Sequence, residues 1–146
     1  MKNKIIALLL SVLLFSTISV SSFSANAATP LTGAVNTQIT PMWTNTDYTR
    51  VALVFTGSRA DCTAVVYGKS GVNKITATAT LYRISSSGSL TAVKTWSGLS
   101  TTGSEFIFDQ AYYVYVGYNY RLVINANVYN GSIMEKISVY DEAFCG

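Results

Sequence analysis

Residues 74–82 read Lys-Ile-Thr-Ala-Thr-Ala-Thr-Leu-Tyr, with an apolar side chain at every second position. Ile75, Ala77, Ala79 and Leu81 therefore share one face of an extended chain, and threonines occupy the other face. A strict period of two with threonine on the outside is typical of a half-buried β-strand. The stretch predicts one strand of a sheet that buries a single face.

Similar runs of β-branched and aromatic residues, separated by Gly, Ser and Asn, lie on both sides of this stretch. We expect further strands over 48–56, 60–67, 90–96 and 105–109, within 112–129, and over 133–140. Residues 97–104 read as a polar loop, Gly117 interrupts the long run, and Asn130-Gly131 is a strong hairpin signal. About seven short strands at roughly ten-residue intervals predict an antiparallel β-sandwich, with a small barrel as the alternative.

The alternation also predicts which side chains form the core. In the run 90–96 the shared face holds Leu90, Ala92, Lys94 and Trp96. Because Lys94 puts a charge on this otherwise apolar face, the run is expected near a sheet edge. In the other runs the inward side chains are Val51, Leu53, Phe55, Cys62, Ala64, Val66, Phe106, Phe108, Tyr120, Leu122, Ile124, Ala126, Val128, Ile133, Glu135, Ile137 and Val139.

The first 27 residues have the layout of a secretory signal peptide. Residues 1–4 carry two lysines, residues 5–15 form an apolar run, and Ala25-Asn26-Ala27 suits a signal peptidase. The apolar run is too short for a permanent membrane helix, which needs about 20 residues, so an uncleaved anchor is disfavoured. We expect a secreted, extracellular product with an extended lead-in over 28–46 and a β-sandwich domain over 47–146.

Export would remove Lys2 and Lys4 and leave 119 residues with eight basic and seven acidic side chains. A chain of this length fits one domain. Because it is nearly neutral, it lacks both the basic stripe that binds nucleic-acid phosphates and a polybasic segment for anionic lipids. We expect no nucleic-acid partner and no transmembrane segment in the mature chain.

Cys62 and Cys145 are the only cysteines, and both lie in the part expected to be exported. In an oxidising compartment an even pair of cysteines predicts one disulfide. The bond would close a loop of 82 residues and stabilise the fold by about 4–5 kcal/mol in the chain-entropy model. A free reactive thiol is the alternative, disfavoured because the chain holds no histidine to activate it.

The predicted domain contains five short segments in a set order: residues 62–68, 74–77, 81–83, 94–97 and 117–122. The last three read Leu-Tyr-Arg, Lys-Thr-Trp-Ser and Gly-Tyr-Asn-Tyr-Arg-Leu. Together the segments resemble a group of short secreted proteins of Gram-positive bacteria, the domain of unknown function DUF6147. The resemblance implies an immunoglobulin-like sandwich and export, and it carries over no functional residue because that group has no assigned activity.

The chain contains no histidine, which excludes Ser-His-Asp and Cys-His catalysis and the common zinc sites. The groups left for acid-base chemistry are seven carboxylates: Asp47, Asp61, Glu105, Asp109, Glu135, Asp141 and Glu142. We expect these to be solvated charges, and we expect no enzyme, no cofactor and no metal. Two alternatives are a carboxylate pair across a sugar cleft, and a calcium site of Asp109, Asp141 and Glu142.

Ten tyrosines exceed what the core of so small a domain needs, and several crowd between residues 112 and 120. Alternate members of a strand point to opposite faces, so some of these rings should be exposed and able to contact a ligand. The candidate binding residues are Tyr112, Tyr113, Tyr115, Tyr118 and Trp43. The structural alternative is cross-strand packing, with Tyr120 as a corner tyrosine that bonds to the backbone.

The sequence thus predicts a secreted, non-catalytic binding module that recognises a protein, cell-surface or glycan partner through tyrosine-rich strands. A secreted antimicrobial or membrane-active protein is the alternative, because weakly basic tyrosine-rich chains also act on membranes. A small carboxylate-dependent hydrolase is a third.

Overall fold

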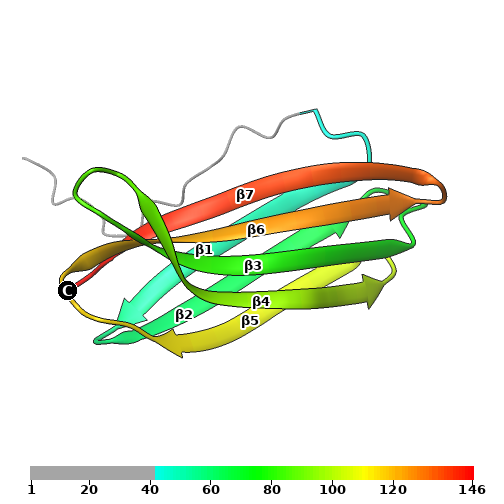
Figure 1. Ribbon diagram of the computed structural model, residues 1–146. Coiled ribbons are helices and arrows are strands. Elements are labelled where there is room, and N and C mark those ends of the chain that lie inside the picture. The colour runs from blue at the N-terminus through cyan, green and yellow to red at the C-terminus, as the bar shows by residue number, and fades with distance from the viewer. Residues whose placement is uncertain (1–41) are drawn as a thin grey trace, which may run out of the picture. The chain divides into compact units, whose positions relative to one another are not determined.

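The computed structural model describes residues 42–146, which form two packed antiparallel β-sheets (Figure 1). The predicted signal peptide and most of the predicted lead-in lie outside these residues. The strands are β1 (Thr46–Thr56), β2 (Arg59–Gly68), β3 (Lys74–Ile84), β4 (Leu90–Thr102), β5 (Glu105–Tyr113), β6 (Tyr118–Asn130) and β7 (Ile133–Cys145). All seven predicted strands are present.

One sheet has the strand order β1-β2-β5, and the other has the order β4-β3-β6-β7. The chain changes sheet between β2 and β3, between β4 and β5, and between β5 and β6, as in immunoglobulin-like sandwiches. The predicted fold class is confirmed. No helix within residues 42–146 is long and apolar enough to cross a membrane.

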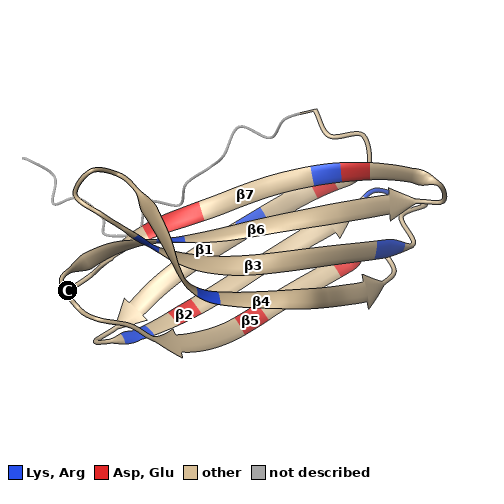
Figure 2. Cartoon of the chain, viewed as in Figure 1, with Lys and Arg blue, Asp and Glu red and all other residues tan. Residues whose placement is uncertain are grey.

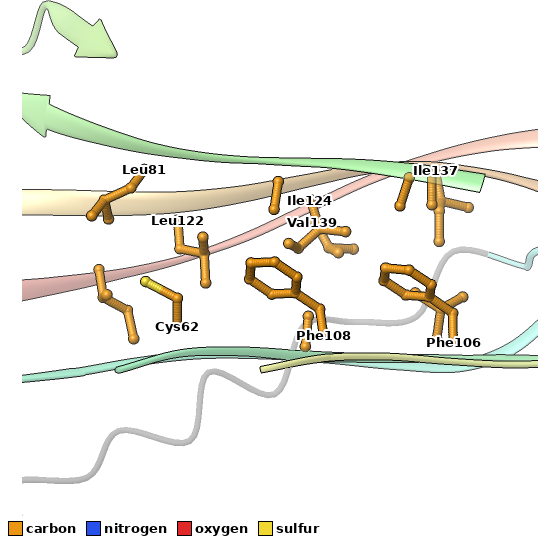
Figure 3. Packing of buried hydrophobic residues seen from close by; sticks show 14 of the residues in the cluster. Cys62, Leu81, Phe106, Phe108, Leu122, Ile124, Ile137 and Val139 are labelled. Atoms are coloured by element: carbon orange, nitrogen blue, oxygen red, sulfur yellow. The ribbon is translucent and has the colours of Figure 1, made fainter. Parts of the chain in front are cut away.

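The core lies between the two sheets and is built by the predicted alternation (Figure 3). Phe106 and Phe108 of β5 point toward Ile124 of β6 and toward Ile137 and Val139 of β7. Each of these side chains is nearly or fully buried. At the start of β7, however, Ile133 is 60% exposed, because it follows the hairpin directly and lies beyond the end of the core.

Strand β4 departs from the prediction in length and in register. It continues to Thr102, through most of the segment expected to be a polar loop, because β3 supplies its backbone partners. Two register shifts change which side chains face inward, so Leu90 and Ala92 are exposed. Val93, Trp96 and Leu99 instead pack against the core. Backbone pairing, rather than side-chain pattern, extends this polar edge strand.

Tyr120, near the start of β6, forms the predicted tyrosine corner. Its ring is 1% exposed and packs 5.5 Å from the ring of Phe55, between centroids. Its hydroxyl donates a hydrogen bond of 2.8 Å to the carbonyl oxygen of Tyr115 in the β5–β6 connection. This bond anchors the connection to the core, as in other immunoglobulin-like domains.

Side chains of β7 close the sandwich along the edge where β1 and β7 lie side by side (Figure 1). The Glu135 carboxylate accepts hydrogen bonds of 2.5 to 3.0 Å from the backbone amides of Thr44, Asn45 and Thr46 and from the Thr46 hydroxyl. Asp141 accepts a bond of 2.9 Å from the amide of Leu53. The expectation that all seven carboxylates are solvated is therefore wrong for Glu135 and Asp141, which satisfy backbone amides of β1 and its lead-in.

Removing the hydroxyl of Tyr120 should destabilise the domain. Tyr120→Phe keeps the ring but deletes the bond to Tyr115, and should lower the free energy of unfolding by about 1 kcal/mol. Urea denaturation measures the change. Tyr113→Phe is the matched control, because that ring is 71% exposed. Equal stability of the two variants would show that the corner contributes nothing.

Stability should depend on pH through Glu135. Burial raises the pKa of Glu135, but hydrogen bonds from Thr46, Thr44 and Asn45 outweigh this and hold it below its ordinary value of 4.5. A carboxyl group whose pKa is lowered on folding stabilises the protein above its unfolded pKa, and loses that effect as the pH falls through its folded pKa. Glu135→Gln should therefore be less stable than the wild type by about 1–2 kcal/mol at pH 7, because it loses charge-assisted bonds.

The difference between the two proteins should shrink as the pH falls below 4.5, which denaturant titration at several pH values measures. Thr46→Val removes one bond to the carboxylate, which brings the folded pKa of Glu135 closer to its unfolded value, so stability should fall by less between pH 7 and pH 2 than in the wild type. A constant difference between wild type and Glu135→Gln down to pH 2 would contradict this account.

Candidate functional site

The clustered tyrosines do not share one strand. Tyr112 and Tyr113 end β5 in one sheet, Tyr115 lies in the connection, and Tyr118 begins β6 in the other sheet. Gly117 has a φ of 88°, a conformation that few other residues adopt, and it turns the chain between the sheets. The predicted strand-borne cluster is therefore a set of side chains around one end of the sandwich.

Three of the predicted binding residues lie exposed at this end, where the chain also terminates (Figure 1). Tyr113 is 71% exposed, Tyr115 is 77% exposed and Tyr118 is 44% exposed. Val116, 55% exposed, and Phe144, 60% exposed, join them. We call these five residues the aromatic end.

Backbone hydrogen bonds hold the aromatic end in place. The amide of Val114 donates to the Ser58 carbonyl of the β1–β2 hairpin at 2.8 Å, and the amide of Gly117 donates to the Cys145 carbonyl at 2.6 Å. The guanidinium of Arg83 lies 4.9 Å from the ring centroid of Tyr118, in the geometry of a cation–π contact. The β5–β6 connection, which carries Tyr115 and Val116, is thus hydrogen-bonded to both sheets.

Tyr112 and Trp43, which the sequence placed with the other candidates, do not belong to this set. Tyr112 is half-buried and meets Trp96 edge-on, with 6.3 Å between ring centroids, so its role is packing between β4 and β5. Trp43 precedes β1 at the opposite end of the sandwich, and its carbonyl accepts a hydrogen bond from the Lys69 ammonium group. Its ring is partly buried against the core.

Sequence reasoning missed Val116 and Phe144. The predicted last strand ended at Tyr140, whereas β7 runs to Cys145 and keeps its alternation to the end. Extending the period of two past Tyr140 would have placed Phe144 on the outward face. Val116 gives no comparable signal, because it lies in the irregular β5–β6 connection.

The carboxylates suggested for calcium lie apart. Asp109 is on the outer side of β5, Asp141 bonds to the amide of Leu53, and Glu142 pairs with Arg121 on the outer face of the other sheet. The alternative of a calcium site from these three residues is therefore wrong. Among residues 42–146 no three His, Cys, Asp or Glu side chains are grouped so that they could hold a metal ion.

The predicted disulfide between Cys62 and Cys145 is absent, and both cysteines are free and buried. Cys62 lies opposite Leu53 of β1, whereas the thiol of Cys145 lies 3.3 Å from the carbonyl oxygen of Gly57. Leu53 and Gly57 are four residues apart, or about 13 Å along an extended chain. A disulfide requires Cα atoms within about 7 Å, so the fold keeps these sulfurs separate.

Burial makes Cys62 chemically inert. Loss of solvent around the thiol, with a smaller effect from the charge of Asp61, raises its pKa to about 12. Because the thiolate is the reactive form, Cys62 acts as a small apolar core residue rather than as a nucleophile.

No protein-family model and no curated protein matches the chain. Among solved structures, the crystal structure of the sporulation control protein Spo0M from Bacillus subtilis is similar to it, with 17% sequence identity and a TM-score of 0.38. The match covers 66% of this chain and 47% of the Spo0M chain. A similarity this low transfers no function.

Thiol titration tests whether Cys62 and Cys145 are free. Two thiols per chain should react with an aromatic disulfide reagent in denaturant, whereas the native protein should react slowly because both sulfurs are buried. Cys145→Ser should leave one reactive thiol in denaturant. An absence of reactive thiols, with an intact mass lower by two hydrogens, would show that the bond forms.

Proposed function

We propose that this protein is a non-catalytic binding module that docks a protein partner through the aromatic end. The observation that carries the proposal is the exposure of Tyr113, Tyr115, Val116 and Phe144, each more than half accessible, at one end of the sandwich. Exposed apolar groups gathered in one region mark interaction surfaces.

The residue types of the aromatic end favour a protein as the partner. Tyr and Phe are enriched at the centres of protein interfaces, where a few large rings supply most of the binding energy. The rings project outward, and the hollows of about 600 and 380 Å³ lie elsewhere, on the outer face of the four-stranded sheet and beside β4 and β5. Exposed rings at the end of the sandwich suit complementary pockets on another protein.

The hydrogen bonds around the aromatic end lower the cost of binding. The bond from Tyr120 to Tyr115 and the bond from Gly117 to Cys145 already order the connection in the free protein. Less conformational entropy is then lost when a partner binds.

The carboxylates support a role without catalysis. The side chains of Glu135 and Asp141 bind backbone amides, and those of Asp61 and Glu142 form ion pairs with Arg59 and Arg121. Together with the lack of histidine in the sequence, this leaves few groups free for acid-base chemistry. The proposal includes export by the predicted signal peptide, so the partner would be an extracellular or cell-surface protein.

A membrane-active protein is the second candidate function, because two arginines adjoin the aromatic end. Arg59 pairs across the sheet with Tyr113, and Arg83 covers Tyr118. Tyrosine rings and basic side chains together are typical of segments that settle at the membrane interface. The exposed Val116 and Phe144 would supply the apolar contact with lipid.

The test compares two double variants of the full chain. Tyr115→Ser with Phe144→Ser removes two of the most exposed rings of the aromatic end. Tyr48→Ser with Ile107→Ser is the matched control, because these residues are 47% and 64% exposed on the outer face of the three-stranded sheet. A partner is first isolated from cell-surface proteins by cross-linking to the wild type, then identified, purified and measured directly by surface plasmon resonance.

The aromatic-end variant should bind the purified partner at least about tenfold more weakly than the wild type, and the control should bind as the wild type does. Equal loss in both variants, or no loss in either, would overturn the proposal. Release of dye from anionic vesicles by the wild type, lost only in the aromatic-end variant, would replace it with the membrane-active function.

A further inference from the structure

A polar hollow lies on the outer face of the four-stranded sheet, away from the aromatic end. This open hollow has a volume of about 600 Å³ and is lined by residues of all four strands, β3, β4, β6 and β7. This size falls in the range of sites that bind small molecules or short segments of polymers. We call it the polar trough.

Strand register builds the trough from two rows of small polar side chains. Thr76 pairs with Asn127, and Asn127 pairs with Lys136, which makes the first row. The second row is Thr78, Asn125 and Ser138. These residues alternate with buried core positions, so their side chains project from the outer face.

Larger side chains border the rows on two sides. Tyr129 lies beyond the first row, with the ammonium group of Lys74 5.7 Å from its ring centroid. Tyr140 lies beyond the second row, 41% exposed, with the guanidinium of Arg121 4.6 Å from its ring centroid. Tyr140 pairs with Val123, six residues from Tyr129 on β6, so about 20 Å of strand separates the two borders.

On the β4 side, the trough lacks a side-chain wall at one position. Gly98 lines it without a side chain, next to the place where the β3–β4 register shifts between Ala77 and Ala79. The trough is therefore open across the strands rather than closed by the edge strand.

The chemistry of the trough matches a sugar chain. Threonine and serine hydroxyls and asparagine amides both donate and accept hydrogen bonds, as sugar hydroxyls do. Among the side chains of the two rows, the structure shows one hydrogen bond, from Asn127 to Thr76 at 3.4 Å, so most of this capacity faces outward. Tyrosine rings at the borders present apolar faces with polar tips, which suit contact with a sugar ring.

The charge of the trough adds a preference for anions. Lys74 and Lys136 line it, and neither forms an ion pair among the described residues. Figure 2 shows a basic residue on β3 and another on β7 near the end of the sheet where β6 and β7 join. Among residues 42–146, no acidic side chain lines the trough.

We propose that the polar trough binds an anionic polysaccharide. A protein partner fits less well, because lysine and serine are depleted at the centres of protein interfaces. Two lysines are also too few for a nucleic-acid channel, which tracks its backbone with many basic side chains. This site is separate from the aromatic end, so the two proposals stand or fall independently.

Affinity electrophoresis and calorimetry with the full chain test the proposal. The probes are polygalacturonate, which carries carboxylates, dextran phosphate, which carries phosphates, dextran, which is neutral, and single-stranded DNA. The wild type should bind one or both acidic polymers more tightly than dextran, and added salt should weaken the binding. The acidic polymer that binds more tightly identifies the source of the anion.

Charge variants locate the site. Lys74→Gln with Lys136→Gln should weaken binding of the acidic polymer by about tenfold or more. Arg50→Gln with Arg59→Gln is the matched control, because it makes the same change in net charge on the other sheet and should retain binding within about twofold.

Asn125→Ala removes a hydrogen-bonding amide without changing the charge, and should also weaken binding of the acidic polymer, whereas the aromatic-end variant should bind it normally. Thermal unfolding confirms that each variant folds.

Four outcomes would each overturn the proposal. They are failure of the wild type to bind either acidic polymer, equal binding of dextran, tighter binding of DNA, and equal loss of binding in the arginine control.

Discussion

The pairing of β3 with β6 is the constraint on which the rest of the structure depends. These two central strands pair over eleven consecutive positions, from Lys74 with Tyr129 to Ile84 with Asn119, without a register shift. A slip of one residue would move every apolar side chain of one strand to the solvent face. The same register places Tyr120 in the core and arranges the threonines and asparagines of the trough in rows.

The sandwich protects its edges in different ways. At the β1–β7 edge, Glu135 and Asp141 reach across and accept hydrogen bonds from backbone amides that no strand partner satisfies. At the opposite edge, β4 carries two register shifts, and irregular edges disfavour pairing with another chain. Trp96 fills the space there, 5.3 Å from Phe108 between ring centroids.

The two proposed binding surfaces use opposite physical properties. The aromatic end exposes apolar rings such as Tyr115, in the hydrogen-bonded β5–β6 connection, and Phe144, at the end of β7. The polar trough offers hydroxyls, amides and two lysines, which form no ion pair within residues 42–146, in a hollow on the outer face of a sheet. A module with both surfaces would be suited to hold a protein close to an acidic polysaccharide.

The sequence alone determined the class of fold, because a side-chain period of two is a local property that each strand shows by itself. It predicted all seven strands, most inward side chains and the corner role of Tyr120. The separation of Cys62 from Cys145 and the division of the tyrosines between two sheets came only from the tertiary structure. Both depend on how strands that are distant in sequence are aligned. Backbone hydrogen bonds between strands set that alignment, and composition does not encode it.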